Sequence, residues 1–162
     1  MADLTISSVT DLGMITLRGD LEVLGRQTRA FAGCAAPEQR MSTASDGRRL
    51  LWMSPDELLL TCPAAESKTM VASLRAAFGD GFATVVEVGD ARAVFDLAGA
   101  DVPGMLAKLM PVDFDRMAET EIRRSRLAQV PAAIWREGAV WRLVCFRSVA
   151  RYAEALLRNA AA

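Results

Sequence analysis

With 162 residues and a net charge of −1, the chain is long enough to bury a core and has no basic excess to neutralise nucleic-acid phosphates. Hydrophobic residues make up 52%, which excludes disorder, and no uncharged stretch is long enough for a membrane span. Histidine is absent, so the chain alone holds neither Ser-His-Asp or Cys-His catalysis nor a histidine-containing metal site. We expect a single domain over 1–162, with neither nucleic acid nor a membrane as partner.

The first part of the chain predicts two strands followed by a helix. The strands lie near Thr5–Val9 and Met14–Arg18, and Asp20 is placed to cap the helix by accepting from its free N–H groups. Gly33 and Pro37 end the helix, and the polar residues 37–48 are expected to form a surface loop. The side chains predicted on its buried side are Leu21, Leu24, Thr28 and Phe31.

A hairpin and a second helix are predicted next. Leu50–Met53 and Glu57–Thr61 are predicted strands on either side of Ser54-Pro55-Asp56, where the proline favours a turn. Residues 65–78 show the spacing of an amphipathic helix, which Gly79 and Gly81 end. Its apolar side is predicted to hold Met70, Val71, Leu74, Ala77 and Phe78.

The second half of the chain repeats this order. Strands are predicted at 84–88 and 92–97, and Gly99-Ala100-Asp101 begins a helix. A polar segment over 113–125 stands where the first half has its loop. Two further strands, 127–136 and 139–146, turn at Glu137-Gly138. The last helix is predicted to bury Val149, Tyr152, Ala153, Leu156 and Leu157.

Self-comparison supports a duplication. Leu17 and Gly19 align with Leu97 and Gly99, and both helix-capping aspartates follow. Further on, Trp52, Leu60 and Cys62 align with Trp135, Leu143 and Cys145. In the closing helices Ala72, Leu74, Arg75 and Ala77 align with Ala155, Leu157, Arg158 and Ala160. The two repeats, about 1–81 and 82–162, are each a ββαββα unit, and we expect the paired tryptophans in equivalent parts of the core.

The duplication predicts the fold class. The first strand of the second repeat can complete a βαββαβ, ferredoxin-like set that the first repeat begins. We therefore expect an α+β fold in which a duplicated ββαββα unit gives two interlocked ferredoxin-like halves with antiparallel sheets.

No residue pattern predicts a catalytic, cofactor or metal site. Asp56 and Glu57 are adjacent in a turn and point apart, so they are not the facing carboxylates of acid–base catalysis. Asp113 and Asp115 could share a face, but a metal site would need further ligands that the sequence does not supply. Neither common phosphate-binding glycine motif occurs.

The cysteines and the first residues of the chain indicate the cellular compartment. Cys34, Cys62 and Cys145 are far apart and form no Cys-x-x-Cys motif, which favours buried free thiols in a reducing environment. The opening Met1–Leu4 lacks the basic and apolar regions of a signal peptide. We expect a cytoplasmic protein.

Five stretches of the chain resemble, in the same order, the gamma subunit of heterotetrameric sarcosine oxidase. They are Leu17-Arg18-Gly19-Asp20, Trp52-Met53-Ser54-Pro55-Asp56-Glu57-Leu58-Leu59-Leu60, Val88-Gly89-Asp90-Ala91-Arg92, Leu106-Ala107-Lys108-Leu109-Met110-Pro111-Val112-Asp113 and Phe146-Arg147-Ser148-Val149-Ala150-Arg151-Tyr152. The string from Trp52 to Leu60 is the most specific of them. The family is similar in fold to the tetrahydrofolate-binding part of glycine-cleavage aminomethyltransferases.

The resemblance implies a role in oxidising sarcosine to glycine, with the methyl carbon passed to tetrahydrofolate and hydrogen peroxide formed. It implies that FAD, FMN, NAD and tetrahydrofolate are held by large alpha and beta subunits, beside a small delta subunit, and that this chain has no active site. Candidate contacts with these partners are Trp52, Pro55, Asp56, Arg123, Arg124 and Arg126.

Alternatives remain open at this point. The arginines at 123–126 could instead form a solvated surface paired with Glu119 and Glu121. The segment from Asp113 to Arg126 departs from the family pattern, which leaves room for a paralogue in a related demethylating complex. A free-standing folate-binding or aminomethyltransferase-like protein and an unrelated assembly factor are the other hypotheses.

Overall fold

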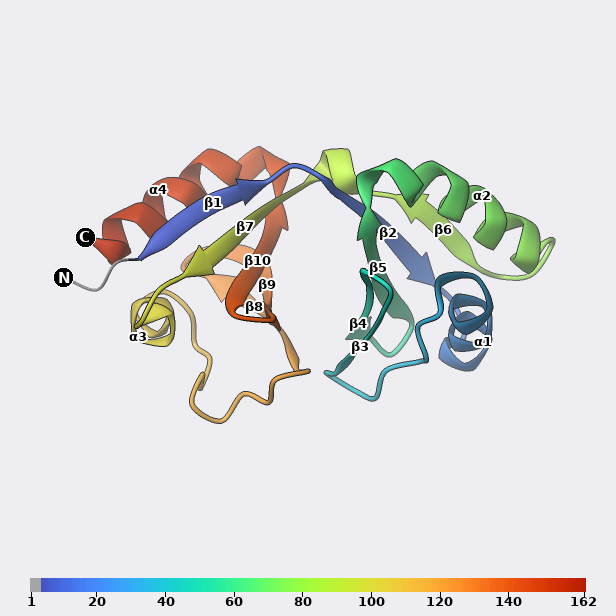
Figure 1. Cartoon of the computed structure of the whole chain (residues 1–162), viewed down its shortest axis with the longest axis horizontal. Helices are drawn as coiled ribbons and strands as arrows, with labels where there is room; N and C mark the ends of the chain where they lie inside the picture. The colour runs from blue at the N-terminus through green and yellow to red at the C-terminus, as the bar shows by residue number, and fades with distance from the viewer. Residues whose placement is uncertain (1–3) are drawn as a thin grey trace. The chain divides into compact units, whose positions relative to one another are not determined.

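The computed structural model describes residues 4–162, which form two five-stranded antiparallel sheets with helices packed on one face of each (Figure 1). Residues 11–89 make up one compact unit, here called the inner unit. The described residues up to 10, together with 90–162, make up the other, here called the terminal unit. The α+β class predicted from the sequence is confirmed. Among the helices of residues 4–162, none has the length and apolar run that crossing a membrane requires.

The inner unit has the strand order β3-β4-β5-β2-β6. Its elements are β2 (Leu12–Arg18), α1 (Leu21–Ala32), β3 (Ser42–Ser45), β4 (Arg48–Ser54), β5 (Glu57–Pro63), α2 (Ser67–Phe78) and β6 (Thr84–Glu87). Asp20 caps α1 as predicted, because its carboxylate accepts from the N–H groups of Glu22 and Val23 at 3.0 Å. Gly33 ends α1 with φ 73°, a left-handed conformation that glycine adopts without strain.

The terminal unit has the equivalent order β1-β7-β10-β9-β8. Its elements are β1 (Thr5–Val9), β7 (Arg92–Ala98), α3 (Val102–Ala107), β8 (Ile122–Leu127), β9 (Val130–Glu137), β10 (Val140–Phe146) and α4 (Ala150–Ala161). Asp101 caps α3 by accepting from the Gly104 N–H at 3.1 Å. Each sheet buries an aliphatic core under its two helices, with Leu24, Leu60 and Leu74 in one unit and Leu106, Leu143 and Leu157 in the other.

The first strands of the two repeats are exchanged between the units. β6 belongs to the second repeat in sequence but pairs with β2 of the inner unit, while β1 belongs to the first repeat and pairs with β7. Each unit thereby gains the fourth strand of a ferredoxin-like set, as the duplication predicted. The compact units consequently divide at residues 10–11 and 89–90 rather than at the repeat boundary near 81.

Strand pairing confirms the alignment of the two repeats in their central strands. Cys62 lies opposite Gly13, and Cys145 lies opposite Ala93, so both cysteines occupy the same position in equivalent ladders. Both side chains are buried in the core beneath the helices of their unit.

The predicted equivalence of the two tryptophans is wrong by one residue. Trp52 on β4 is half-buried and packs against the core beneath α1 and α2. Trp135 on β9 is fully buried, but its neighbour Ile134 points into the helix-side core. Because successive side chains of a strand point to opposite faces, Trp135 lies on the face away from the helices.

The register of the outer hairpins explains this correction. Leu60 faces Leu50, whereas its equivalent Leu143 faces Ile134. Trp135 therefore corresponds to Leu51, and a one-residue slip exchanges the faces of every side chain in the strand. The two tryptophans still lie in equivalent strands, which is what the duplication requires.

Two short edge strands were missed in the sequence. Residues 42–45, expected in a surface loop, form β3, and Ile122–Leu127 form β8, where a polar segment was expected. Leu127 ends β8 and does not start the following strand. Both strands pair on one side only, so few of their side chains need to be apolar.

Two aromatic side chains predicted on buried helix faces are instead exposed. Phe31 on α1 is 43% exposed, and Tyr152 on α4 is 44% exposed. Each lies at the margin of its apolar stripe, where the helix turns its side chains away from the sheet.

Candidate functional site

The turn between β4 and β5 is held by a small polar network around Asp56. The Ser54 hydroxyl donates to the Asp56 carboxylate at 2.6 Å, and Arg18 forms an ion pair with it at 3.1 Å. The Gly19 N–H donates to the Asp56 carbonyl at 3.0 Å. The hydrogen bond from Ser54, followed by the charge of Arg18, lowers the pKa of Asp56 below its ordinary value despite slight desolvation. The turn thus presents an exposed Pro55 beside a fixed anion.

Trp52 stands on the same hairpin but is directed toward the helix-side core. Its backbone N–H donates to the Met41 carbonyl at 3.0 Å, and its ring is half-buried. Of the hairpin candidates, Pro55 and Asp56 are therefore the accessible pair, while Trp52 is only partly exposed.

The arginines of β8 are divided between the two faces of their sheet. Arg123 shares a face with Leu127, which is buried in the helix-side core, and pairs with Glu121 at 2.8 Å. Glu121 is 7% exposed and also accepts from the Ala118 N–H at 3.1 Å. The side chains of Arg124 and Arg126 are exposed on the other face. The local pairing considered from the sequence therefore holds for Arg123, and the exposed arginine pair is what could meet a partner.

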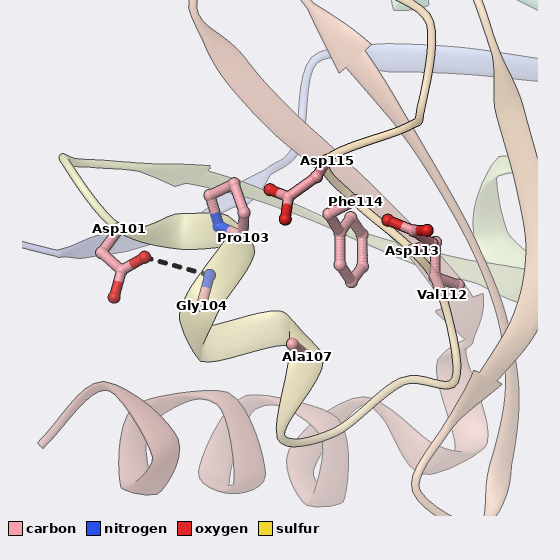
Figure 2. A pocket seen from close by; sticks show the side chains of 8 residues that line it. All are labelled: Asp101, Pro103, Gly104, Ala107, Val112, Asp113, Phe114 and Asp115. Carbon is pink, nitrogen blue, oxygen red and sulfur yellow. Dashed lines mark hydrogen bonds between the residues drawn. The ribbon is translucent and has the colours of Figure 1, made fainter.

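A cavity of about 380 Å³ lies in the terminal unit, between the start of α3 and the loop after it (Figure 2). Asp101 is turned toward Gly104, and Asp113 and Asp115 lie on either side of the Phe114 ring. Asp113 accepts from the Arg116 N–H at 3.3 Å. The lining residues are Asp101, Pro103, Gly104, Ala107, Val112, Asp113, Phe114 and Asp115.

The chemistry of this cavity does not fit a phosphate group. Its ionisable lining groups are all carboxylates, whose charge repels an anionic ligand. Phe114 serves the core, because its ring meets Trp141 edge-on with centroids 5.4 Å apart. Across residues 4–162, no group of three or more Cys, Asp or Glu side chains is placed to hold a metal ion.

A partly buried ionic network on the terminal sheet was not found from the sequence. Arg142 on β10 donates to both carboxylate oxygens of Asp96 on β7, at 2.7 and 2.8 Å. Glu137 accepts from Arg142 at 3.5 Å and from the indole N–H of Trp135 at 3.1 Å. Asp96 and Trp135 lie directly opposite Arg142 on its two sides, so only the strand register reveals the network.

All three cysteines are free and buried, as the sequence predicted. Burial raises the pKa of Cys34 and Cys145 and raises that of Cys62 to about 11. The nearby Glu66 adds to the shift at Cys62, where the Arg48 charge opposes it. Thiols of this kind are protonated at neutral pH, so they are poor nucleophiles and poor metal ligands.

The raised pKa of Cys62 predicts a loss of stability at alkaline pH. Below pH 9 the thiol is protonated in both states; between pH 9 and about 11 the unfolded chain alone releases the proton. We expect the free energy of unfolding to fall by about 1–2 kcal/mol from this group across that range. Urea titrations just below pH 9 and near pH 11, on wild type and Cys62→Ala, measure it. An equally steep fall in Cys62→Ala would contradict the assignment.

The fold is similar to that of a solved protein. Aminomethyltransferase T of the glycine cleavage system from Bartonella henselae superposes with a TM-score of 0.72 at 14% identity, over 95% of this chain and 45% of that one. This chain therefore shares its duplicated fold with part of that aminomethyltransferase.

A sequence match identifies the family. The model of the sarcosine oxidase gamma subunit family matches residues 28–162, so the chain belongs to that family. The resemblance noted in the sequence is confirmed.

Curated relatives and a solved structure agree with this assignment. A sarcosine oxidase subunit gamma from Arthrobacter sp. is 32% identical over 113 residues, which are 67% of this chain and 55% of the relative. One from Corynebacterium sp. (strain P-1) is 33% identical over 65% of this chain and 53% of the relative. The chain thus spans about half the length of these relatives. A chain of the heterotetrameric sarcosine oxidase from Corynebacterium sp. U-96, in complex with pyrrole 2-carboxylate, superposes with a TM-score of 0.86 at 24% identity, over 97% of this chain and 83% of that one.

Proposed function

We propose that this chain is the non-catalytic gamma subunit of a heterotetrameric, cytoplasmic sarcosine oxidase and contributes to assembly with the large subunits. The family match over residues 28–162 carries the proposal. In the proposed reaction of the whole complex, sarcosine and tetrahydrofolate give glycine and methylene-tetrahydrofolate. The two electrons removed from the amine reduce dioxygen to hydrogen peroxide.

The chemistry available in the chain supports a non-catalytic role. It has no histidine to act as a base near neutral pH. Its three thiols are buried with raised pKa values. Its carboxylates at turns and helix starts are engaged in capping, as for Asp20 and Asp101.

The same features support placing FAD, FMN, NAD and tetrahydrofolate in the alpha and beta subunits rather than here. A nucleotide pyrophosphate commonly docks on the free N–H groups at a helix start. At α1 these groups are occupied by the Asp20 carboxylate, whose charge would also repel the phosphate. The carboxylates of the terminal-unit cavity oppose an anionic ligand for the same reason.

We expect the purified chain alone to be colourless, to give flat calorimetric titrations with a reduced folate, and not to turn over sarcosine. Co-expressed with candidate alpha, beta and delta subunits, it should co-purify with them, and omitting it should lower the yield of the intact complex. Flavin absorption from the isolated chain would contradict the cofactor placement. Folate binding at micromolar concentration would favour the free-standing folate-binding protein, and failure to co-purify would contradict the subunit role.

The partner contacts stay a prediction that the same co-purification can test. Charge reversal at the exposed Arg124 and Arg126 is expected to weaken retention of the complex at physiological salt. The matched control reverses Arg29, an exposed arginine in the last turn of α1. If all variants retain the complex equally, the β8 arginines are not part of the interface.

A further inference from the structure

Two arginines that align between the repeats make the same unusual contact in both units. Arg75 on α2 donates from its Nε to the backbone carbonyl of Val85 on β6, at 2.9 Å. Arg158 on α4 donates from its Nη2 to the backbone carbonyl of Ile6 on β1, at 3.5 Å. In each case an exposed helix side chain reaches the backbone of a sheet edge.

The two acceptors are equivalent positions. Val85 lies opposite Leu17, and Ile6 lies opposite Leu97. Because Leu17 and Leu97 align between the repeats, Arg75 and Arg158 contact equivalent backbone positions in the two units. A chance surface contact would not be expected at the same place twice.

The acceptors belong to the strands that the repeats exchange, and each strand is the edge of its sheet. The N–H of Val88, just after β6, donates to the Met14 carbonyl of β2. In an antiparallel pair, residues whose backbone groups bond the neighbouring strand alternate with residues whose backbone groups point away from it. Val88 is of the first kind, so Val85 is of the second. The Val85 carbonyl therefore points to the open side of the edge. An open edge is a template for pairing with another chain, and proteins protect such edges in specific ways.

We propose that Arg75 and Arg158 are a matched pair of strand locks. Each arginine comes from one repeat and holds the edge strand that the other repeat contributes. Each also occupies a carbonyl that an incoming strand from a second molecule would need. At α4 the lock is oriented by Glu154, which accepts from the Arg158 guanidinium at 2.8 and 3.1 Å.

The test uses the full chain with Arg75→Met, Arg158→Met and the double variant. Methionine keeps an apolar stem and removes the donor. We expect the amide of Val88, at the end of β6, to exchange roughly tenfold faster in Arg75→Met, the effect of losing one hydrogen bond from a charged donor. At equal concentration the double variant should form larger species than wild type in size-exclusion chromatography with light scattering.

Three control variants separate the strand lock from the general effect of removing a surface charge. Arg151→Met removes a different exposed arginine of α4 and should behave as wild type. Glu154→Gln removes the ion pair but keeps the donor, so its effect should be smaller than that of Arg158→Met. Arg75→Lys keeps a cationic donor and should recover part of the lost protection. Wild-type Val88 exchange in Arg75→Met would overturn the proposal, and so would an unchanged size of the double variant or an equal effect of Arg151→Met.

Discussion

Replacing Trp135 by alanine is expected to lower the free energy of unfolding by about 3–5 kcal/mol, the range for truncating a fully buried large side chain. The side chain is 0% exposed, so its removal leaves a cavity between tightly packed neighbours. The change also leaves the Glu137 carboxylate without its indole donor. Urea unfolding followed by circular dichroism measures the loss.

Trp52→Ala is the matched control for that measurement. Because this ring is half-buried at a different face of the equivalent strand, we expect a loss of about 1–2 kcal/mol. Equal losses of unfolding free energy in the two variants would contradict the strand register that places the two tryptophans on different faces, and would favour equivalent positions for them.

Arg142→Met is expected to lower the free energy of unfolding by about 2–4 kcal/mol, because it leaves partly buried carboxylates without their counter-charge. The side chains of Arg142 and Asp96 are 14% and 22% exposed, and the bond is bidentate. The hydrogen bonds that Arg142 donates to Asp96 raise the pKa of Arg142, so the guanidinium stays charged at every pH at which the protein folds.

The double variant Asp96→Leu/Arg142→Met should recover much of this loss, because it removes both charges and keeps apolar volume. Arg18→Met breaks the exposed ion pair with Asp56 and should have no resolvable effect, since solvent screens charges that are more than half exposed. A large loss of unfolding free energy in Arg18→Met, or no loss in Arg142→Met, would contradict the expectation that the Arg142–Asp96 pair contributes more to stability than the Arg18–Asp56 pair.

The fold of this chain does not by itself indicate an activity. It shares its duplicated fold with an aminomethyltransferase, but a shared fold does not transfer a reaction. Asp20 caps a helix, Asp56 holds a turn, and the three thiols are buried. We propose that the Pro55–Asp56 turn and the exposed arginines of β8 contact the partner subunits.

The sequence determined the features that depend on local chemistry. Asp20 and Asp101 cap helices because a short carboxylate next to a helix start meets free N–H groups wherever the chain folds. The strands around Pro55 follow from turn preference and apolar runs. The order of elements in both repeats was readable because each one carries its own periodicity.

Features that depend on strand pairing were decided by the tertiary structure. β3 and β8 pair on one side only, and their side chains carry little of the apolar signal that marks a strand. Trp52 and Trp135 align in sequence, but the pairing of β9 with β10 is shifted by one residue relative to the pairing of β4 with β5. A shift that is small along the chain places the two side chains on opposite faces.

The strand locks combine both kinds of information. Arg75 and Arg158 are aligned in the sequence, but nothing local distinguishes them from other exposed helix arginines. Their role depends on the exchange of β1 and β6, which brings a strand of one repeat beneath a helix of the other. The sequence by itself determined the duplication and the capping of α1 and α3. The tertiary structure decided which sheet edges α2 and α4 reach, because backbone acceptors become available only once the strands have paired.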